Sequence, residues 1–352
     1  MTAGEYRKQD PGKQRFLRKF TAALFAAAAV TAAGIFPAAA ETAGQEETAG
    51  MQAASEAETG GQQIKSAMDV ICAPSGIAAA EDGSFFVTDT YNKVIWKVTD
   101  GVSVVYAGAR SAEDLYGEPV GGYNDSSLDQ AYFKEPWAIA PFLNGYAVSD
   151  SANNVVRLIT DQSARTATGK PEAGFVNGRG IAASFDRPTG LATDGEGNLY
   201  IADTNNSCIR KVTTNGDVST YAGGLSEPTG LCWQNGSLYV AESGANRILK
   251  ITGGAAEIVA GSGQEGNQDG EAAQASFSSP QGVAVSSDGI IYVSDTGNGA
   301  VRKIQDGAVT TMIASSPQNM ESYPIAPAGL LIRDGQLLVC DNFSKKVFVL
   351  ER

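Results

Sequence analysis

The sequence contains no histidine at all, and this absence excludes several kinds of active site. A Ser-His-Asp triad needs an imidazole as its general base, and many catalytic zinc sites use imidazole ligands. Cysteine is scarce too: the chain of 352 residues has four, without the C-x-x-C spacing of a metal site. We expect these four to be free thiols at small packed positions, with Cys72 and Cys340 as the pair to test for a disulfide. The four are Cys72, Cys208, Cys232 and Cys340.

Positive charge is also in short supply. The chain has 26 Lys and Arg against 39 Asp and Glu. Residues 1–40 hold six of the basic and two of the acidic groups, so the rest has 20 against 37, a net charge of −17. Affinity for a phosphate backbone comes mainly from Lys and Arg, so the composition argues against a nucleic-acid partner. A large net negative charge is also typical of proteins that remain soluble because like charges repel one another.

Large apolar runs are absent except near the N-terminus. There, a basic segment precedes an apolar run over residues 20–36, and Ala38-Ala39-Ala40 follows. This order predicts a secretory signal peptide at residues 1–40, and therefore an exported protein, secreted or associated with the cell envelope. The alternative is an uncleaved membrane anchor, because the run is just short of a comfortable span. Residues 41–63, rich in Ala, Glu, Thr, Gln and Gly, predict a disordered linker.

The remaining chain repeats one unit of roughly forty residues six times. Each unit opens with a proline, and an acidic residue follows fourteen or fifteen residues later. The prolines are Pro74, Pro136, Pro188, Pro228, Pro280 and Pro327, and the acids are Asp89, Asp150, Asp203, Glu242, Asp295 and Asp341. Six matching pairs indicate a repeat architecture.

Each unit predicts four short strands separated by turns. A pair such as Asn235-Gly236, which tolerates positive φ, marks a tight hairpin, and apolar strands flank the acid-containing turn. The pattern is typical of a propeller blade, so we expect residues 64–352 to form an all-β, six-bladed propeller. The sixth unit stops after its third strand, Val347 to Leu350. We therefore expect the N-terminal strand, Ile64 to Ile71, to complete the last blade and close the ring.

The turn after the second strand carries a family resemblance. Asp203-Thr204-Asn205-Asn206 is followed by Ile209-Arg210-Lys211, and this order resembles the third segment of NHL repeats. The first and fifth units keep most of the pattern, whereas the fourth and sixth depart from it. Three connections share a second pattern, in which an Asp or Asn precedes Ala-x-Phe by six residues and the Phe precedes the proline by three. These residues are Asp125 with Phe133, Asn177 with Phe185 and Asp269 with Phe277.

The repeated acids and asparagines invite two interpretations. A ring of carboxylates near the central channel could bind cations. We favour a structural role, because Asp at the start of a turn accepts hydrogen bonds from backbone N–H groups and every blade needs that turn. The residues of these turns are Asp89, Asn92, Asp150, Asn153, Asp203, Asn206, Glu242, Asp295, Asn298 and Asp341.

Function is therefore sought where the units differ. The long connections, residues 110–135, 169–187, 262–279 and 314–326, should lie on one face together with the acid-containing turns, and long loops on a rigid scaffold often carry binding residues. We refer to this as the long-loop face. Its aromatic and acidic residues predict a platform for a sugar or a peptide, although loop packing explains the aromatics equally well. The candidates are Tyr116, Tyr123, Phe175, Tyr323, Glu113, Asp114, Glu172 and Glu265.

The missing histidine restricts which six-bladed enzymes this chain could resemble in activity. Peptidyl-hydroxyglycine lyases, streptogramin lyases and quinone-dependent sugar dehydrogenases resemble the predicted fold, but they depend on His. We therefore expect a noncatalytic binding or scaffold module for a protein or a cell-envelope glycan, without a cofactor, and in contact with a membrane only through an N-terminal anchor. The alternative is a gluconolactonase-type hydrolase, whose divalent cation, such as calcium, needs only oxygen ligands.

Overall fold

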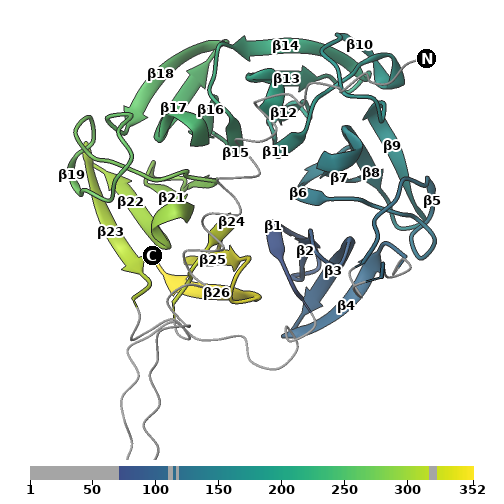
Figure 1. Ribbon diagram of the computed structural model, residues 1–352, viewed down its shortest axis with the longest axis horizontal. Coiled ribbons are helices and arrows are strands. Elements are labelled where there is room, and N and C mark those ends of the chain that lie inside the picture. Colours follow the sequence, from purple (N-terminus) through teal and green to yellow (C-terminus); the bar gives the residue numbers. More distant parts are fainter. Residues whose placement is uncertain (1–70, 110–113, 116–118, 317–322) are drawn as a thin grey trace, which may run out of the picture. The chain divides into compact units, whose positions relative to one another are not determined.

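The computed structural model describes residues 71–109, 114–115, 119–316 and 323–352, which belong to the unit Gly61–Arg352. Their strands form six small antiparallel sheets arranged around a central axis (Figure 1). The predicted six-bladed propeller is confirmed. The predicted signal peptide and linker lie outside the described residues. Within the described part, no helix is long and apolar enough to cross a membrane.

The blades follow one another along the chain. Blade 1 contains β1 (Pro74–Ala79), β2 (Phe85–Asp89), β3 (Val94–Thr99) and β4 (Val102–Ala107). Blade 2 contains β6 (Pro136–Phe142), β7 (Gly145–Asp150), β8 (Val155–Ile159) and β9 (Ser163–Gly169). Blade 3 contains β11 (Pro188–Thr193), β12 (Leu199–Asp203), β13 (Cys208–Val212) and β14 (Asp217–Gly223).

Blades 4 and 5 repeat this order, and blade 6 has three described strands. Blade 4 contains β15 (Pro228–Gln234), β16 (Ser237–Glu242), β17 (Arg247–Thr252) and β18 (Ala255–Ala260). Blade 5 contains β20 (Gly282–Val285), β21 (Ile291–Asp295), β22 (Ala300–Gln305) and β23 (Ala308–Ala314). Blade 6 contains β24 (Pro327–Arg333), β25 (Gln336–Asp341) and β26 (Lys346–Glu351).

Three blades carry a fifth strand of two residues, which the sequence did not predict. β5 (Ser126–Ser127), β10 (Gly178–Arg179) and β19 (Gly270–Glu271) pair antiparallel with β9, β14 and β23. Each comes from the long connection that precedes its blade and runs back along the blade's outer edge. The four-stranded prediction is therefore too small for blades 2, 3 and 5. Pairing of this kind covers part of a sheet edge.

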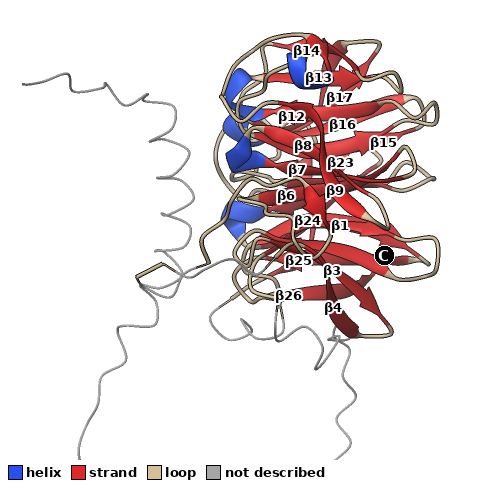
Figure 2. Cartoon of the chain, turned by 90° about the vertical axis from the view of Figure 1, so that its right-hand side faces the viewer, coloured by secondary structure: helices blue, strands red, loops and turns tan. Residues whose placement is uncertain are grey.

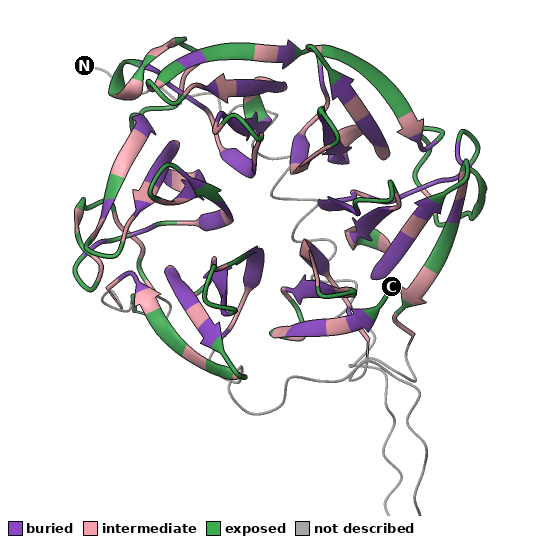
Figure 3. Cartoon of the chain, turned by 180° about the vertical axis from the view of Figure 1, so that it is seen from behind, coloured by how far each residue is buried: buried purple, intermediate pink, exposed green. Residues whose placement is uncertain are grey.

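The second strand of each blade is buried along most of its length because a neighbouring blade covers each of its faces. Every residue of β12 is buried. Leu199 and Ile201 pack in a cluster with blade 2, whereas Tyr200 and Ala202 pack in a cluster with blade 4. Figure 3 shows the inner strands mostly buried and the outermost strands largely exposed. The core is thus divided into apolar interfaces between blades.

The ring is closed by packing between blades 6 and 1. Leu338, Cys340 and Val347 of blade 6 share an apolar cluster with Ile77 and other residues of blade 1, and Ile71 is fully buried in it. In the described residues, blade 6 ends with β26 at its outer edge. The segment expected to complete it, apart from Ile71, lies outside the described residues, so that part of the fold stays a prediction.

The turns between the second and third strands share one face of the propeller. Four of them contain a short 3-10 helix: η1 (Ser151–Asn153), η3 (Thr204–Asn206), η4 (Ser243–Ala245) and η5 (Thr296–Asn298). A fifth, η2 (Gly180–Ala182), lies in the connection before blade 3. Figure 2 shows the helices on the same side as the connections between blades. The predicted Asn235-Gly236 hairpin has positive φ at both residues and lies at the opposite side.

Candidate functional site

The acid of the repeated turn in blade 3 is completely buried and fully engaged. One oxygen of Asp203 accepts a hydrogen bond from the backbone N–H of Asp186 at 2.8 Å. The other accepts from Asn206 Nδ2 at 2.9 Å and from Arg210 Nη1 at 2.7 Å. Asp203 and Arg210 both have side chains with no exposed surface. The acid therefore holds the backbone before the blade and the arginine of the next strand.

The guanidinium of Arg210 fixes the long connection before blade 3. It donates to the carbonyl oxygens of Ser184 and Val176 and, at 2.7 Å, to Asn177 Oδ1. The rings of Phe175 and Phe185 lie 4.8 and 5.1 Å from it, at cation–π distance. Asn177 and Phe185 are the Asn and the Phe of the second sequence pattern, and both contact this buried guanidinium. The contacts explain why the two residues recur at a fixed spacing.

The same arginine lock, as we call this set of contacts, recurs in blades 2 and 5. Arg157 pairs with Asp150 and Asp125, at 3.2 and 2.7 Å. Arg302 pairs with Asp295 and Asp269, at 2.7 and 2.6 Å. Phe133 and Phe277 lie 4.9 and 5.2 Å from the respective guanidinium groups. The blades with an arginine lock are those with a fifth strand.

In the other three blades, another residue stands at the position of Arg210. Asp89 Oδ2 accepts from Trp96 Nε1 at 3.1 Å, since Trp96 stands where blade 3 has Arg210. Glu242 forms an ion pair with Arg247 and accepts from the N–H of Ser226. The donors to Asp341 are Ser344, Phe343 and Ala326. Burial raises the pKa of Asp341, and its hydrogen bonds with Ser344 and the Ala326 N–H oppose that shift.

Backbone N–H groups two or three residues after the acid donate to Asp89 and Asp341, as expected for such a turn. In blades 2, 3 and 5, backbone donors that precede the blade reach the acid, as they also do in blades 1 and 6. The asparagine of the turn also fixes the connection. Asn153, Asn206 and Asn298 each donate to a carbonyl oxygen in the loop before their blade, at 2.8 to 2.9 Å. These contacts join the turn residues to the blades and loops around them, and the structural role of the repeated turns stays a prediction.

In blades 2 to 5, the hydroxyl residue after the acid links the blade to the next one. Ser151 Oγ donates to the carbonyl oxygen of Pro188 at 2.5 Å, and Thr204 Oγ1 donates to that of Pro228 at 2.8 Å. The corresponding donors Ser243 and Thr296 reach Pro280 and Pro327. The threonine of the repeat motif is therefore an interblade residue.

The predicted platform residues are distributed over several loops. Tyr123 and Phe175 are 44% and 56% exposed, and the inner face of each lies over the arginine of its own blade, Arg157 or Arg210. Glu265 is exposed and accepts from Ser278 Oγ at 3.0 Å. Asp114 and Glu172 are exposed, and Tyr323 is partly buried. Tyr116 and Glu113 lie outside the described residues.

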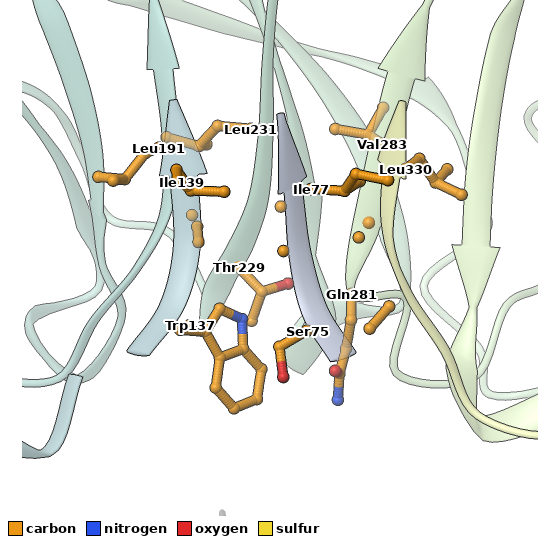
Figure 4. Close-up of a pocket in the computed structure, with 17 residues that line it drawn as sticks. Ser75, Ile77, Trp137, Ile139, Leu191, Thr229, Leu231, Gln281, Val283 and Leu330 are labelled. Atoms are coloured by element: carbon orange, nitrogen blue, oxygen red, sulfur yellow. The ribbon is translucent and has the colours of Figure 1, made fainter. Parts of the chain in front are cut away.

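A cavity lies on the propeller axis, and the residues that line it were not among those predicted from the sequence. It has a volume of about 70 Å³ and is lined by the first strands of all six blades. Figure 4 shows Ser75, Trp137, Thr229 and Gln281 at one level and a ring of aliphatic side chains at another. We call these four residues the channel mouth and the aliphatic ring the apolar layer. The apolar layer consists of Ile77, Ile139, Leu191, Leu231, Val283 and Leu330.

The channel mouth opens toward the long-loop face, because its residues directly follow the prolines at which the connections end. A signal for it was present in the sequence. The residue after the proline is a small hydroxyl residue in blades 1, 3 and 4, but it is Trp137 in blade 2 and Gln281 in blade 5. The apolar layer was harder to predict from the sequence, since its aliphatic residues are typical of any buried strand.

The described residues contain no group of three or more Cys, Asp or Glu side chains that could hold a metal ion. The four cysteines, all of which lie in the described part of the chain, form no disulfide. Burial raises the pKa of Cys208 to about 12 and also raises that of Cys340, which disfavours the reactive thiolate. The buried acids and thiols are therefore parts of the packed frame.

Six blades, the repeated acid turn and its asparagine define this protein as an NHL-type propeller. A model of the NHL repeat matches residues 277–304. A model of the teneurin NHL domain matches residues 47–264, more than half of the sequence, and the chain belongs to this family.

Curated relatives agree with this assignment. Teneurin-3 from Danio rerio is 27% identical over 278 residues, covering 74% of this chain and 9% of that protein. Protein SUPPRESSOR OF QUENCHING 1, chloroplastic, from Arabidopsis thaliana is 28% identical over 218 residues, covering 50% of this chain and 21% of that protein. The chain thus spans about a fifth or less of the length of these relatives.

Two solved structures illustrate how widely the fold is shared. A gluconolactonase from Xanthomonas campestris has a TM-score of 0.59 at 12% identity, covering 82% of this chain and 88% of that one. A virginiamycin B lyase from Staphylococcus aureus has a TM-score of 0.53 at 15% identity, covering 81% and 97%. At such low identities the likeness concerns the fold alone.

Proposed function

We propose that this chain is a noncatalytic, exported binding or scaffold module that docks a protein or a cell-envelope glycan on its long-loop face. The proposal rests on the hydrogen bonds that the repeated acids and arginines form. Their hydrogen bonds are directed to the blades and loops, so they build the frame instead of serving a reaction. What varies between blades is the outer surface of the loops that the frame holds in place.

Membership in the teneurin NHL domain family supports a binding role, and the exposed rings of Tyr123 and Phe175 support this location. Each ring has one face on a buried arginine and is therefore held rigidly. A rigid aromatic side chain loses little conformational entropy on binding. A gluconolactonase-type activity has weaker support, because the described residues offer no carboxylate cluster for its cation.

The test uses two probes, a phage-displayed random peptide library and an array of cell-envelope glycan fragments. We expect one of them to bind the full chain, and Phe175→Glu to weaken that binding at least tenfold, since a charge would replace an exposed apolar contact. Leu143→Glu is the matched control: Leu143 is also 56% exposed, but it lies in the β6–β7 turn at the opposite face.

Equal effects of the two substitutions would contradict the location on the long-loop face. Calcium-dependent turnover of simple lactones, abolished by a chelator, would contradict the noncatalytic role. Both measurements use the same protein preparation.

A further inference from the structure

The channel mouth and the apolar layer together form a small, two-level receptacle on the axis of the propeller. The cavity volume is about 70 Å³. One water molecule needs about 10–15 Å³ of such volume, so the cavity holds several waters or the end of one side chain.

The chemistry of the lining restricts what can enter. None of the 17 lining residues is charged, and six of them form the apolar layer. Moving a charged group out of water into such surroundings without a partner is strongly unfavourable. Water released from an aliphatic wall by an apolar group instead favours binding. The receptacle therefore suits an uncharged, apolar group.

Among the side chains of the channel mouth, one buried acceptor has no donor within the described part of the chain. The hydroxyl of Thr229 bonds with Ser243, and that of Ser75 bonds with Thr90. By contrast, the side-chain oxygen of Gln281 is buried without a partner among the described residues. A buried acceptor without a donor is costly. A ligand that offers one N–H beside its apolar group would satisfy this oxygen.

The surroundings of Trp137 favour a peptide over a glycan as the ligand of the receptacle. A sugar that stacks on tryptophan needs an open ring face, but Trp137 is only 5% exposed. The guanidinium of Arg187 lies 5.8 Å from its ring, and Arg187 is itself paired with Glu135 at 2.7 Å. Trp137 therefore acts as a wall of the receptacle.

We infer that the channel mouth receives one uncharged apolar side chain of a docking polypeptide, whose adjacent backbone N–H donates to Gln281. The inference rests on the proposed function and narrows it to a polypeptide partner with an apolar anchor. An anchor in a desolvated central pocket is a common source of binding energy in protein interfaces.

The test begins with peptides selected on the full chain from a phage-displayed random library. We expect them to share one position occupied by Leu, Ile, Met or Val, and replacement of that residue by Asp to weaken binding at least tenfold. Leu330→Phe, which fills the cavity from the apolar layer, should weaken the selected peptide at least tenfold. The control Leu143→Phe, on the opposite face, should leave its affinity unchanged.

A second measurement needs no change to the apolar layer. Titration of the unaltered chain with the selected peptide should shift the indole N–H signal of Trp137 in an NMR spectrum and leave that of Trp233 in place. Full affinity in Leu330→Phe, provided that it melts like the unaltered chain, would overturn the inference, as would an unshifted Trp137 signal. Peptides that lack a shared apolar position would also overturn it.

The two proposals fail in different ways. If Phe175→Glu abolishes binding while Leu330→Phe does not, the long-loop face remains the docking surface and the axial anchor is wrong. If the glycan fragments bind and the peptide library yields nothing, the polypeptide partner is wrong.

Discussion

At the scale of single residues, the unusual feature is a full positive charge in the interior of three blades. Arg157, Arg210 and Arg302 are among the largest fully buried side chains. Removing a guanidinium from water costs several kcal/mol, and only good geometry offsets that cost. In each of the three blades, a buried carboxylate, loop carbonyl oxygens and at least one aromatic ring offset the cost of burying the guanidinium.

We predict that Arg210→Met lowers the free energy of unfolding by about 3–5 kcal/mol, because Asp203 would remain buried without its cation. Urea denaturation of the full chain measures this change. The control is Lys250→Met, which removes a cation from an exposed pair with Glu257 at 3.4 Å. Surface pairs contribute about 0–1 kcal/mol. Similar losses in both variants would show that the arginine lock does not stabilise the blade.

The sequence allowed part of this site to be predicted. Repetition led to the prediction of a structural role for Asp203 and Asn206. The spacing that Asn177 and Phe185 share with two other connections was also noted, but the sequence did not show what these residues contact. Arg210 was not predicted to be buried, because an arginine beside Lys211 in a strand is typical of an exposed face. Its partner Asn177 is 33 residues away along the chain, so only the folded blade brings the two together.

At the scale of elements, the first strands pack against one another through backbone close to the axis. A side chain added at Gly190 would collide with the carbonyl oxygen of Thr229 in the next blade, and one added at Gly230 with that of Gln281. Blade 2 has Ala138 at this position. The closeness of the strands limits the width of the channel.

We predict that Gly190→Ala lowers the free energy of unfolding by about 1–3 kcal/mol, the usual cost of overpacking. Thermal or urea unfolding checks this value. Gly195→Ala is the matched control, because a side chain there would meet no atom within 4 Å. A loss at Gly195 as large as that at Gly190 would point to a backbone effect instead of a collision.

The strands were predictable in number and order because apolar segments alternate with turn residues in every unit. The fifth strands were not, since Ser126–Ser127, Gly178–Arg179 and Gly270–Glu271 lack the β-branched and aromatic residues typical of strands. They pair because the arginine lock holds each connection against the outer edge of its blade. A tertiary contact thus creates secondary structure that local sequence does not favour.

At the scale of the whole propeller, stability depends on closing the ring between blades 6 and 1. The apolar cluster at that junction contains Ile71, the first described residue. An outer strand left unpaired in blade 6 would expose a sheet edge and weaken the junction.

We predict that deleting residues 62–72 turns cooperative unfolding into marginal folding or aggregation, because the buried Ile71 and the expected closing strand would both be lost. Differential scanning calorimetry and light scattering measure the two effects. Deletion of residues 1–60 is the control and should leave the melting midpoint unchanged. An unchanged midpoint after deletion of 62–72 would refute the closing strand.

The arginine lock of blade 3 draws its partners from that blade and from the loop immediately before it, and those of blades 2 and 5 do the same. The contacts of each lock thus stay within one blade and its own loop, although Arg187, at the end of the loop before blade 3, also pairs with Glu135 in the loop before blade 2. A substitution on the outer surface of one loop therefore leaves the locks of the other blades intact. The buried cation lets the exposed part of each loop vary while the frame beneath it is kept.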